Sequence, residues 1–412
     1  MQPTDEPSGA LARIERAAPD SRGASPSGDL PAVRPEVDVS DTERPWLDYA
    51  EFGERFVTHA VTAARIEAAV AGIAGRGMTI GPLSIGPAGL AGFVAEGKVG
   101  KPVVSHHGPG VNHAVTVPAT FTLKLLLGGK KLRLQARAEI NLTLRARTAE
   151  PVLIVIDIPP VAAEDVSLFL RAQAVESAWE FLLDPIAGIV PREVAARVNA
   201  MLADPHARGK RVFDIDAIVG RDRSPHRERA GFDWSFDWTD YGRFGHRFFT
   251  EVVTRDRVFE VVERLAGRPI EVGPLRTGPR KSATVTVHGA VRVPSLTEKS
   301  REPTTFDLVI PVGLDITVDV LKANRYRADV EVHLTLTARA ADPLLLVIDV
   351  SSPDPERISM EFKAHGMRAA TLGMLAGIKK QVIAQVAKVI GKEIAAGSGR
   401  IIDVAARIDK AV

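Results

Sequence analysis

The stretch WLDYAEFGERFVTHAVT occupies residues 46–62, and WTDYGRFGHRFFTEVVT occupies residues 238–254. A constant shift of 192 residues aligns the two without a gap. The same shift aligns PVLIVID at residues 151–157 with PLLLVID at residues 343–349. A repeat of this length has the size of one domain, whereas solenoid repeats are much shorter. The chain is therefore a tandem duplication.

The repeat boundaries follow from where the duplicated patterns begin and end. We predict a first domain at residues 42–219 and a second at residues 230–412, joined by a charged linker at residues 220–229. Residues 1–41 are rich in Pro, Ser, Gly, Asp and Arg and have few large apolar side chains. Such a composition cannot bury enough apolar surface to fold, so we predict a disordered leader.

Composition excludes several classes of protein. Apolar residues make up 45% of the chain and charged residues 25%, which is typical of a soluble globular protein. No run approaches the roughly 18 apolar residues of a membrane span, and the first residues lack a secretory signal pattern. The absence of cysteine excludes disulfides, thiol catalysis and cysteine-ligated metals. A net charge of +2 gives no reason to expect nucleic acid as a partner. The absence of cysteine and of a signal pattern predicts a cytoplasmic protein.

Each repeat begins with a helical pattern. Residues 49–73 place their large apolar side chains within about 100° of arc at 100° per residue, and residues 241–265 do the same. Gly75 and Gly267 follow as stop signals. We predict one amphipathic N-terminal helix in each repeat.

Long alternating stretches follow the helix. Residues 131–147 and 326–339 alternate apolar and polar side chains without a slip, and residues 121–127 and 306–318 alternate in the same way. This pattern predicts long antiparallel strands with one apolar face, which must curve around another element. A closing helix follows at residues 375–394. In the first repeat its counterpart contains two prolines, so we predict a kink or two shorter helices. The fold class is α+β.

The order of these elements and their duplication resemble the tubular lipid-binding (TULIP) superfamily, which includes bactericidal/permeability-increasing protein. The resemblance covers about Trp46 to Asp409 and rests on architecture. It implies a long helix wrapped by a curved sheet around an apolar tube that holds lipid tails. The chain departs from secreted members because it has neither a signal peptide nor a disulfide, which favours a cytoplasmic bacterial-type relative.

On this resemblance, the lipid contacts the apolar faces of the N-terminal helices and of the long strands. The predicted lining residues are Phe52, Phe56, Ile66, Val70, Leu134, Leu142, Leu144, Phe244, Phe248, Val262, Val332, Leu334 and Leu336. The alternative is a non-enzymatic scaffold or protein-interaction module whose interiors are filled by side chains.

Several polar residues are candidates for a catalytic or metal site. The sequence has no phosphate loop, nucleophile elbow or zinc-protease motif, so we predict no catalytic residue and no cofactor. His106, His107 and His113 form a poor metal site, because adjacent imidazoles do not converge on one ion and the second repeat keeps none of them. The duplicated Asp48 and Arg65 favour structural roles over a polar site. Asp157 and Asp349 likewise favour turn or cap roles.

One surface bears on membrane contact. Lys380, Lys388 and Lys392 share one side of the last long helix, opposite its aliphatic face. Lysines near an anionic lipid surface support a transient, salt-sensitive encounter. The alternative is that they form the solvent-exposed side of a helix that closes the second domain. The sequence therefore predicts peripheral membrane contact as an extension of lipid binding and leaves the structural role open.

Overall fold

The computed structural model describes residues 45–85, 89, 91–171, 180–219, 235–277, 282–319, 323–363, 369–396 and 400–411. The predicted leader and linker lie outside these residues. The boundaries predicted for the two domains stay a prediction, and both repeats belong to one unit, Arg44–Val412.

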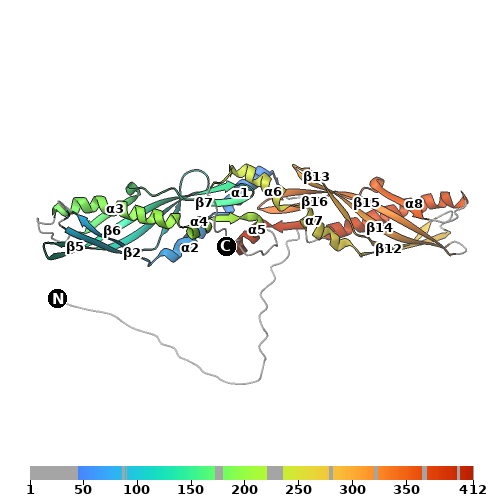
Figure 1. Ribbon diagram of the computed structural model, residues 1–412. Helices are drawn as coiled ribbons and strands as arrows, with labels where there is room; N and C mark the ends of the chain where they lie inside the picture. The colour runs from blue at the N-terminus through green and yellow to red at the C-terminus, as the bar shows by residue number, and fades with distance from the viewer. Residues whose placement is uncertain are drawn as a thin grey trace, which may run out of the picture. The chain divides into compact units, whose positions relative to one another are not determined.

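The repeats contain the same elements in the same order, except that α4 of the first repeat has no counterpart in the described residues of the second (Figure 1). The first repeat consists of β1 (Trp46–Leu47), α1 (Tyr49–Ala60), α2 (Ala63–Val70), β2 (Gly77–Ile85), β3 (Ala91–Val99), β4 (Val103–His106), β5 (Asn112–Leu127), β6 (Lys130–Ala149), β7 (Leu153–Asp157), β8 (Val166–Arg171), α3 (Glu180–Ala203), α4 (Pro205–Gly209), β9 (Val212–Asp214) and α5 (Ile215–Val219). The second consists of β10 (Trp238–Thr239), α6 (Tyr241–Val252), α7 (Arg255–Val262), β11 (Pro269–Thr277), β12 (Ala283–Val291), β13 (Ser295–Arg301), β14 (Thr304–Asp319), β15 (Ala323–Ala341), β16 (Leu345–Val350), β17 (Ile358–Lys363), α8 (Ala369–Ala396), β18 (Ile401–Asp403) and α9 (Val404–Ala411).

Each repeat builds one antiparallel sheet around its two longest strands. The first sheet runs β2-β3-β5-β6-β7-β9, with β4 on β5 and β8 on β6. The second runs β11-β12-β14-β15-β16-β18, with β13 on β14 and β17 on β15. The long alternating stretches form β5, β6, β14 and β15, and their apolar residues share the buried face. The alternation therefore predicted both the strands and the face that they bury.

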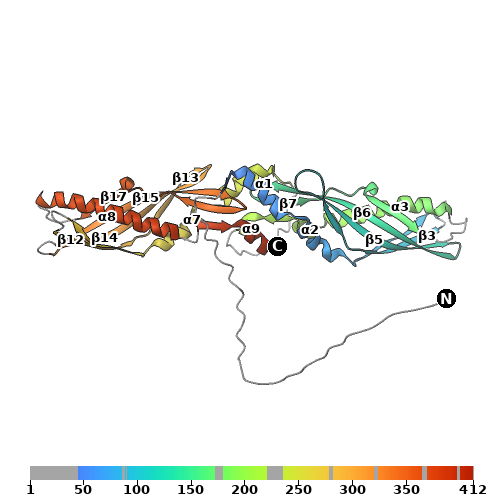
Figure 2. The ribbon, with the colours of Figure 1, turned by 180° about the vertical axis from the view of Figure 1, so that it is seen from behind.

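The closing helices show that both sheets are curled. Helix α3 contacts β2 at one edge of the first sheet and β8 at the other edge, and α8 contacts β11 and β17 in the same way. One helix can reach both edges only if the sheet bends around it (Figure 2). Ile186, Val190 and Val194 of α3 are buried in this interior. The predicted α+β class with duplicated, curved antiparallel sheets is confirmed.

Helix α3 tests one of the two alternatives predicted for its prolines. Pro185 and Pro191 both lie inside one helix, so α3 is not split into two shorter helices. Each proline removes one backbone donor. The buried stripe of α3 packs against the sheet on either side of Pro191, so tertiary packing maintains the helix through these positions.

The sequence analysis predicted that a curved sheet wraps each N-terminal helix, and the structure places these helices elsewhere. Helix α1 packs against α6 of the other repeat, and the elements that span the curled sheets are α3 and α8. The single helix expected at residues 49–73 is also broken, because Thr62 accepts a hydrogen bond from the Arg65 backbone N–H and begins α2. By length and composition, Tyr49–Ile73 could cross a membrane, but here it is two helices joined by a cap.

The repeats also exchange their first strands. Strand β1 pairs with β15 of the second repeat, and β10 pairs with β6 of the first. Each sheet of the described structure therefore has nine strands, one of which comes from the other repeat.

Candidate functional site

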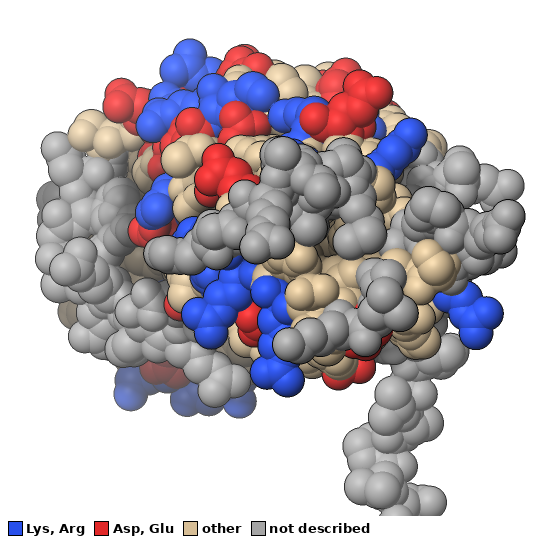
Figure 3. All heavy atoms as spheres, turned by 90° about the vertical axis from the view of Figure 1, so that its right-hand side faces the viewer, with Lys and Arg blue, Asp and Glu red and all other residues tan. Residues whose placement is uncertain are grey.

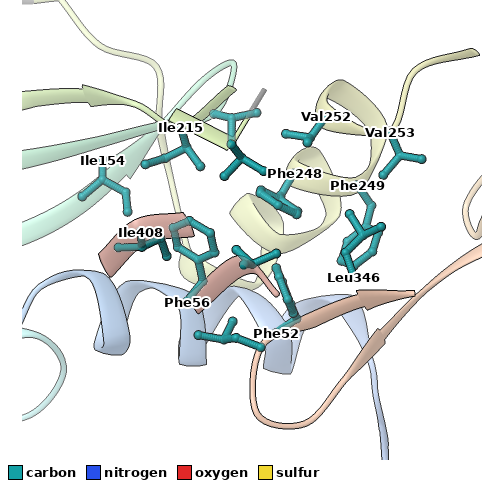
Figure 4. Close-up of a cluster of buried hydrophobic side chains, with 14 of the residues drawn as sticks. Phe52, Phe56, Ile154, Ile215, Phe248, Phe249, Val252, Val253, Leu346 and Ile408 are labelled. Carbon is teal, nitrogen blue, oxygen red and sulfur yellow. The ribbon is translucent and has the colours of Figure 1, made fainter. Parts of the chain in front are cut away.

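Four of the predicted lining residues meet in one aromatic cluster where α1 crosses α6 (Figure 4). The Phe52 ring lies 5.2 Å from the Phe248 ring, and the Phe56 ring lies 5.4 Å from both Phe244 and Phe248. All four side chains are at most 1% exposed. These rings contact one another, and the cluster is completed by Phe249, which the sequence analysis did not select.

The remaining helical predictions lie on α2 and α7, the helices that follow α1 and α6 in the chain. Ile66 of α2 is buried, and Val70 of α2 and Val262 of α7 are partly buried against the same core. The strand predictions all lie on the buried faces of the two curled sheets, in β6 and β15. They are Leu134, Leu142 and Leu144 in the first repeat, and Val332, Leu334 and Leu336 in the second. Contact of any of the thirteen residues with a lipid stays a prediction.

The interior of the first curled sheet differs from that of the second at one cross-strand pair of the long strands. We call the position of such a pair along the strands a level. Ala119 and Ala138 pair across β5 and β6. The matching pair in the second repeat is Val312 and Val330. Each valine is larger by two carbon atoms, and the facing helical stripe is the same in both repeats, because Ile186, Val190 and Val194 match isoleucine and valines in α8. The side chains at this level of the first interior are therefore smaller.

The next level of the first interior is filled differently. Phe121 replaces Leu314 of the second repeat, and its ring lies directly over Gly97, where a Cβ atom would clash with the ring. Gly289 accommodates Leu314 in the same manner. Large and small side chains thus alternate along the first interior, with the alanine pair beside a large ring.

An apolar seam runs along α3 where the helix meets the two edge strands. Met78 and Leu83 of β2, and Leu168 and Leu170 of β8, are on the inward face and are only partly buried. We call these four residues the α3 seam. In the second repeat, Ile270 and Met360 occupy the positions of Met78 and Leu168 and are 2% and 3% exposed. Leu275 and Phe362, at the positions of Leu83 and Leu170, are partly buried as well. The first repeat is therefore more open only at Met78 and Leu168.

The duplicated polar residues have structural roles. Asp48 accepts a hydrogen bond from the Glu51 backbone N–H at 2.6 Å and caps α1, and Asp240 caps α6 in the same way. Arg65 pairs with Asp409 of α9, and Arg257 pairs with Asp216 of α5, so each N-terminal segment is joined to the end of the other repeat.

The tryptophans before the N-terminal helices pack on the other repeat. The Arg339 guanidinium lies 4.4 Å from the Trp46 ring centroid and 3.4 Å from Asp349. Arg147 makes the corresponding contacts with Trp238, at 3.6 Å, and with Asp157. Asp157 and Asp349 therefore hold arginines in place, which differs from the turn and cap roles expected.

The histidines are arranged across a strand pair. His106 and His113 face each other, with ring centroids 5.7 Å apart. His113 is buried, and its Nε2 lies 3.3 Å from the Val61 carbonyl, where the chain passes from α1 to α2. Burial lowers the pKa of His113 below its ordinary value. This histidine therefore supports the break between the two helices.

A second candidate site is an open groove of about 700 Å³ beside the helix crossing. Its charged and histidine lining residues are Asp240 before α6, Arg243, His246 and Arg247 of α6, Arg301 at the end of β13, and Glu302. The sequence analysis missed this groove. A signal was present in the sequence, since Arg243 and His246 of α6 replace Glu51 and Glu54 of α1.

The comparisons with known proteins add the following. No family model and no curated protein matches the chain. Among solved structures, the chain is similar to lipopolysaccharide binding protein, with 9% identity, a TM-score of 0.27, and coverage of 84% of this chain and 90% of that one. It is also similar to P47 from Clostridium botulinum A2, with 8% identity, a TM-score of 0.25, and coverage of 79% and 85%.

The chain's own elements define a tandem α+β protein with two curled antiparallel sheets, each closed by a helix. This is the tandem architecture that the TULIP resemblance implied.

Proposed function

We propose that this protein binds a lipid or another elongated hydrophobic molecule in the apolar interiors of its curled sheets, and that it has no enzymatic role. The α3 seam carries the proposal. Met78 and Leu168 face inward from opposite edges of the sheet, yet both remain partly exposed beside the closing helix. Apolar side chains that line an accessible interior favour a hydrophobic ligand, because each buried CH₂ group contributes about 0.8 kcal/mol.

The alanine pair supports the first repeat as the main binding site. Leu168 of the seam pairs with Ala138, which pairs with Ala119, so the seam leads directly to the smallest side chains of the interior. The second repeat has Met360, Val330 and Val312 along the same row. We therefore expect the first repeat to bind more ligand than the second.

Two measurements test the proposal. Protein purified from its native host is extracted with organic solvent, and the extract is analysed by mass spectrometry; a lipid present in fixed ratio to the protein is expected. Leu168→Glu introduces a charge into the seam and should reduce the bound lipid severalfold. Phe169→Glu is the matched control, because Phe169 is the outward neighbour and is 56% exposed.

The scaffold alternative predicts other results. If the interiors are only packed cores, the native extract contains no lipid. If lipid is found but Leu168→Glu and Phe169→Glu retain equal amounts, the seam is not the route to it. The free energy of unfolding of each variant is measured alongside, so that loss of lipid is separated from loss of fold.

A further inference from the structure

Hydrogen bonds of unequal strength attach helix α3 to the two edges of its sheet. At the β2 edge, Arg197 donates one exposed hydrogen bond to the Thr79 carbonyl at 2.8 Å. On the other side, Asn199 donates to the Val161 carbonyl at 2.9 Å and accepts from the Val161 N–H at 2.8 Å, in the segment that leads into β8. Both of these bonds are partly buried. Because an exposed hydrogen bond competes with water, the β2 side is the weaker attachment.

The two attachments lie on nearly opposite sides of the helix. Arg197 and Asn199 are two residues apart, which corresponds to about 160° around an α-helix. Val198 lies between them and packs against the core. Helix α3 can therefore turn away from β2 about the contact of Asn199 with Val161, without leaving β8.

Two methionines border the weaker side. Met78 of β2 is only partly buried. Met201 is 48% exposed and lies four residues after Arg197, so it faces the same side of α3. Methionine is unbranched and adapts to gaps of different shapes. The side chains at the β2 edge of α3 can therefore rearrange when the helix moves.

The second repeat has an ion pair at the same place. A shift of 192 residues places Arg76 on Arg268 and Met201 on Glu393. Arg268, just before β11, pairs with Glu393 of α8, whereas Met201 offers no carboxylate to Arg76. The attachment of α8 to its edge strand therefore includes a charge pair that α3 does not have at this position.

The β2 edge is aligned with the alanine pair of the first interior. The Val99 N–H donates to the Arg76 carbonyl at 3.0 Å. Val99 pairs with Ala119, and Ala119 pairs with Ala138. An opening between α3 and β2 therefore gives access to the level at which the first interior has its alanines.

We propose that a hydrophobic ligand enters the first repeat between α3 and β2, and that Arg197 is the latch that closes this entry. The ligand rests on the proposed function, whereas the opening of the helix does not. When Arg197 releases the Thr79 carbonyl, both groups can bind water, which lowers the cost of opening. The first repeat is therefore expected to exchange its ligand faster than the second.

The test uses the full chain, which has no cysteine of its own. Ala138→Cys places a thiol at a position that is 0% exposed, so a thiol reagent reaches it only when the interior opens. Arg197→Ala should raise the labelling rate of this thiol about threefold to tenfold, the change in an opening equilibrium expected from the loss of one hydrogen bond. Arg192→Ala is the matched control, because Arg192 is exposed on another side of the same helix.

Further variants separate opening at the latch from a general loss of stability. Met201→Glu supplies the carboxylate that Glu393 provides in the second repeat, so it should slow the labelling of Ala138→Cys, whereas Met201→Gln should not. Val330→Cys reports on the second repeat, and Arg197→Ala should leave its labelling rate unchanged. Ala119→Cys repeats the measurement from the neighbouring strand if Ala138→Cys fails to fold.

The latch is overturned if Arg197→Ala and Arg192→Ala give equal labelling rates at Ala138→Cys. It is also overturned if Arg197→Ala accelerates labelling of Val330→Cys as much as that of Ala138→Cys, because the whole protein is then less stable.

A ligand measurement distinguishes this proposal from the proposed function. Uptake of a pyrene-labelled fatty acid by the full chain is followed by stopped-flow fluorescence. Faster uptake by Arg197→Ala than by Arg192→Ala supports entry between α3 and β2. Equal uptake rates overturn this entry and leave lipid binding intact. If no variant takes up the probe, the proposed function fails, and the labelling rates alone decide whether Arg197 is a latch.

Discussion

Gly53 of α1 and Gly245 of α6 lie against each other at the helix crossing. A Cβ atom built on Gly53 would stand 2.7 Å from the Gly245 nitrogen, and one built on Gly245 would stand 2.9 Å from the Gly53 nitrogen. The approach is reciprocal, so each helix requires glycine in the other. This contact brings the backbones close enough for the surrounding phenylalanine rings to interlock.

Gly53→Ala should therefore destabilise the protein. The added methyl group meets backbone atoms, which cannot rotate away, so we expect a loss of at least 1–3 kcal/mol in the free energy of unfolding, roughly the cost of overpacking. Chemical denaturation measures it. Gly188→Ala is the control, because Gly188 is an exposed helical glycine with open space around it, and it should be neutral or stabilising by about 0.5–1 kcal/mol. An equal change in the free energy of unfolding of the two variants would contradict the close contact of α1 and α6 at Gly53 and Gly245.

Tyr49→Phe and Tyr241→Phe should both destabilise the protein. The Tyr49 hydroxyl donates to the Ala338 carbonyl at 2.6 Å and accepts from the buried Thr304 N–H at 3.2 Å. The Tyr241 hydroxyl donates to the Ala146 carbonyl at 2.6 Å and also has a hydrogen bond with the Val111 backbone. Each substitution leaves buried backbone groups without a partner, at a cost of about 1–3 kcal/mol in the free energy of unfolding. Thermal unfolding of both variants measures the loss, and an unchanged stability of either variant would argue against its hydrogen bonds.

The exchanged strands should be coupled through Trp46 and Arg339. A double-mutant cycle with Trp46→Ala and Arg339→Ala is expected to show an interaction free energy of about 0.5–1 kcal/mol, typical of an exposed cation–π contact. The corresponding cycle with Trp238 and Arg147 should agree within error. A coupling of zero in both cycles would mean that the rings do not hold the repeats together.

His113→Phe should remove an acid-dependent loss of stability. Burial lowers the pKa of His113 in the folded protein, so the unfolded chain binds more protons in acid. The contribution to stability is therefore complete above the ordinary histidine pKa of about 6.5 and falls as the pH drops below it. The second repeat has Phe306 at the matching place in its long strand, so phenylalanine should fit.

Denaturation between pH 7.5 and 5 measures this effect. The wild type should lose stability over this range, and His113→Phe should lose less. His206→Gln, at an exposed position in α4, is the control and should follow the wild type. A pH profile of His113→Phe identical to that of the wild type would place the acid response elsewhere.

Membrane contact through α8 stays a prediction, as does a cytoplasmic location. Lys380, Lys388 and Lys392 are exposed on α8, opposite the buried Val382 and Val386. Figure 3 shows the side of the protein that lies at the right of Figure 1, where α8 is drawn. Basic and acidic side chains are interspersed on this side. We therefore expect weak co-sedimentation with anionic vesicles that disappears at physiological salt, because three lysines contribute only about 1 kcal/mol each.

Replacing these three lysines by glutamine should abolish the low-salt sedimentation. The matched control replaces Lys98, Lys130 and Lys131, which are exposed in the first repeat. If both triple variants sediment equally, the α8 lysines are only the solvent-exposed side of the closing helix.

Local pattern determined much of this fold. The alternation of residues 131–147 and 326–339 predicted the long strands and their buried faces, because side chains on a strand alternate between its two faces whatever the rest of the chain does. The 192-residue shift predicted that the architecture is made twice. Caps such as Asp48 are also local, since they act within one helical turn.

Tertiary structure alone decided which partner each element has. The pairing of Trp46 with Ala341, the meeting of Gly53 with Gly245 and the shared contacts of Glu150 with Arg243 and Arg247 join residues far apart in the chain. Periodicity shows that a helix has an apolar face, but it does not show which surface covers that face. Because the two repeats are alike, either sheet offers a suitable surface to α1, and only the packing of the folded chain selects the other repeat.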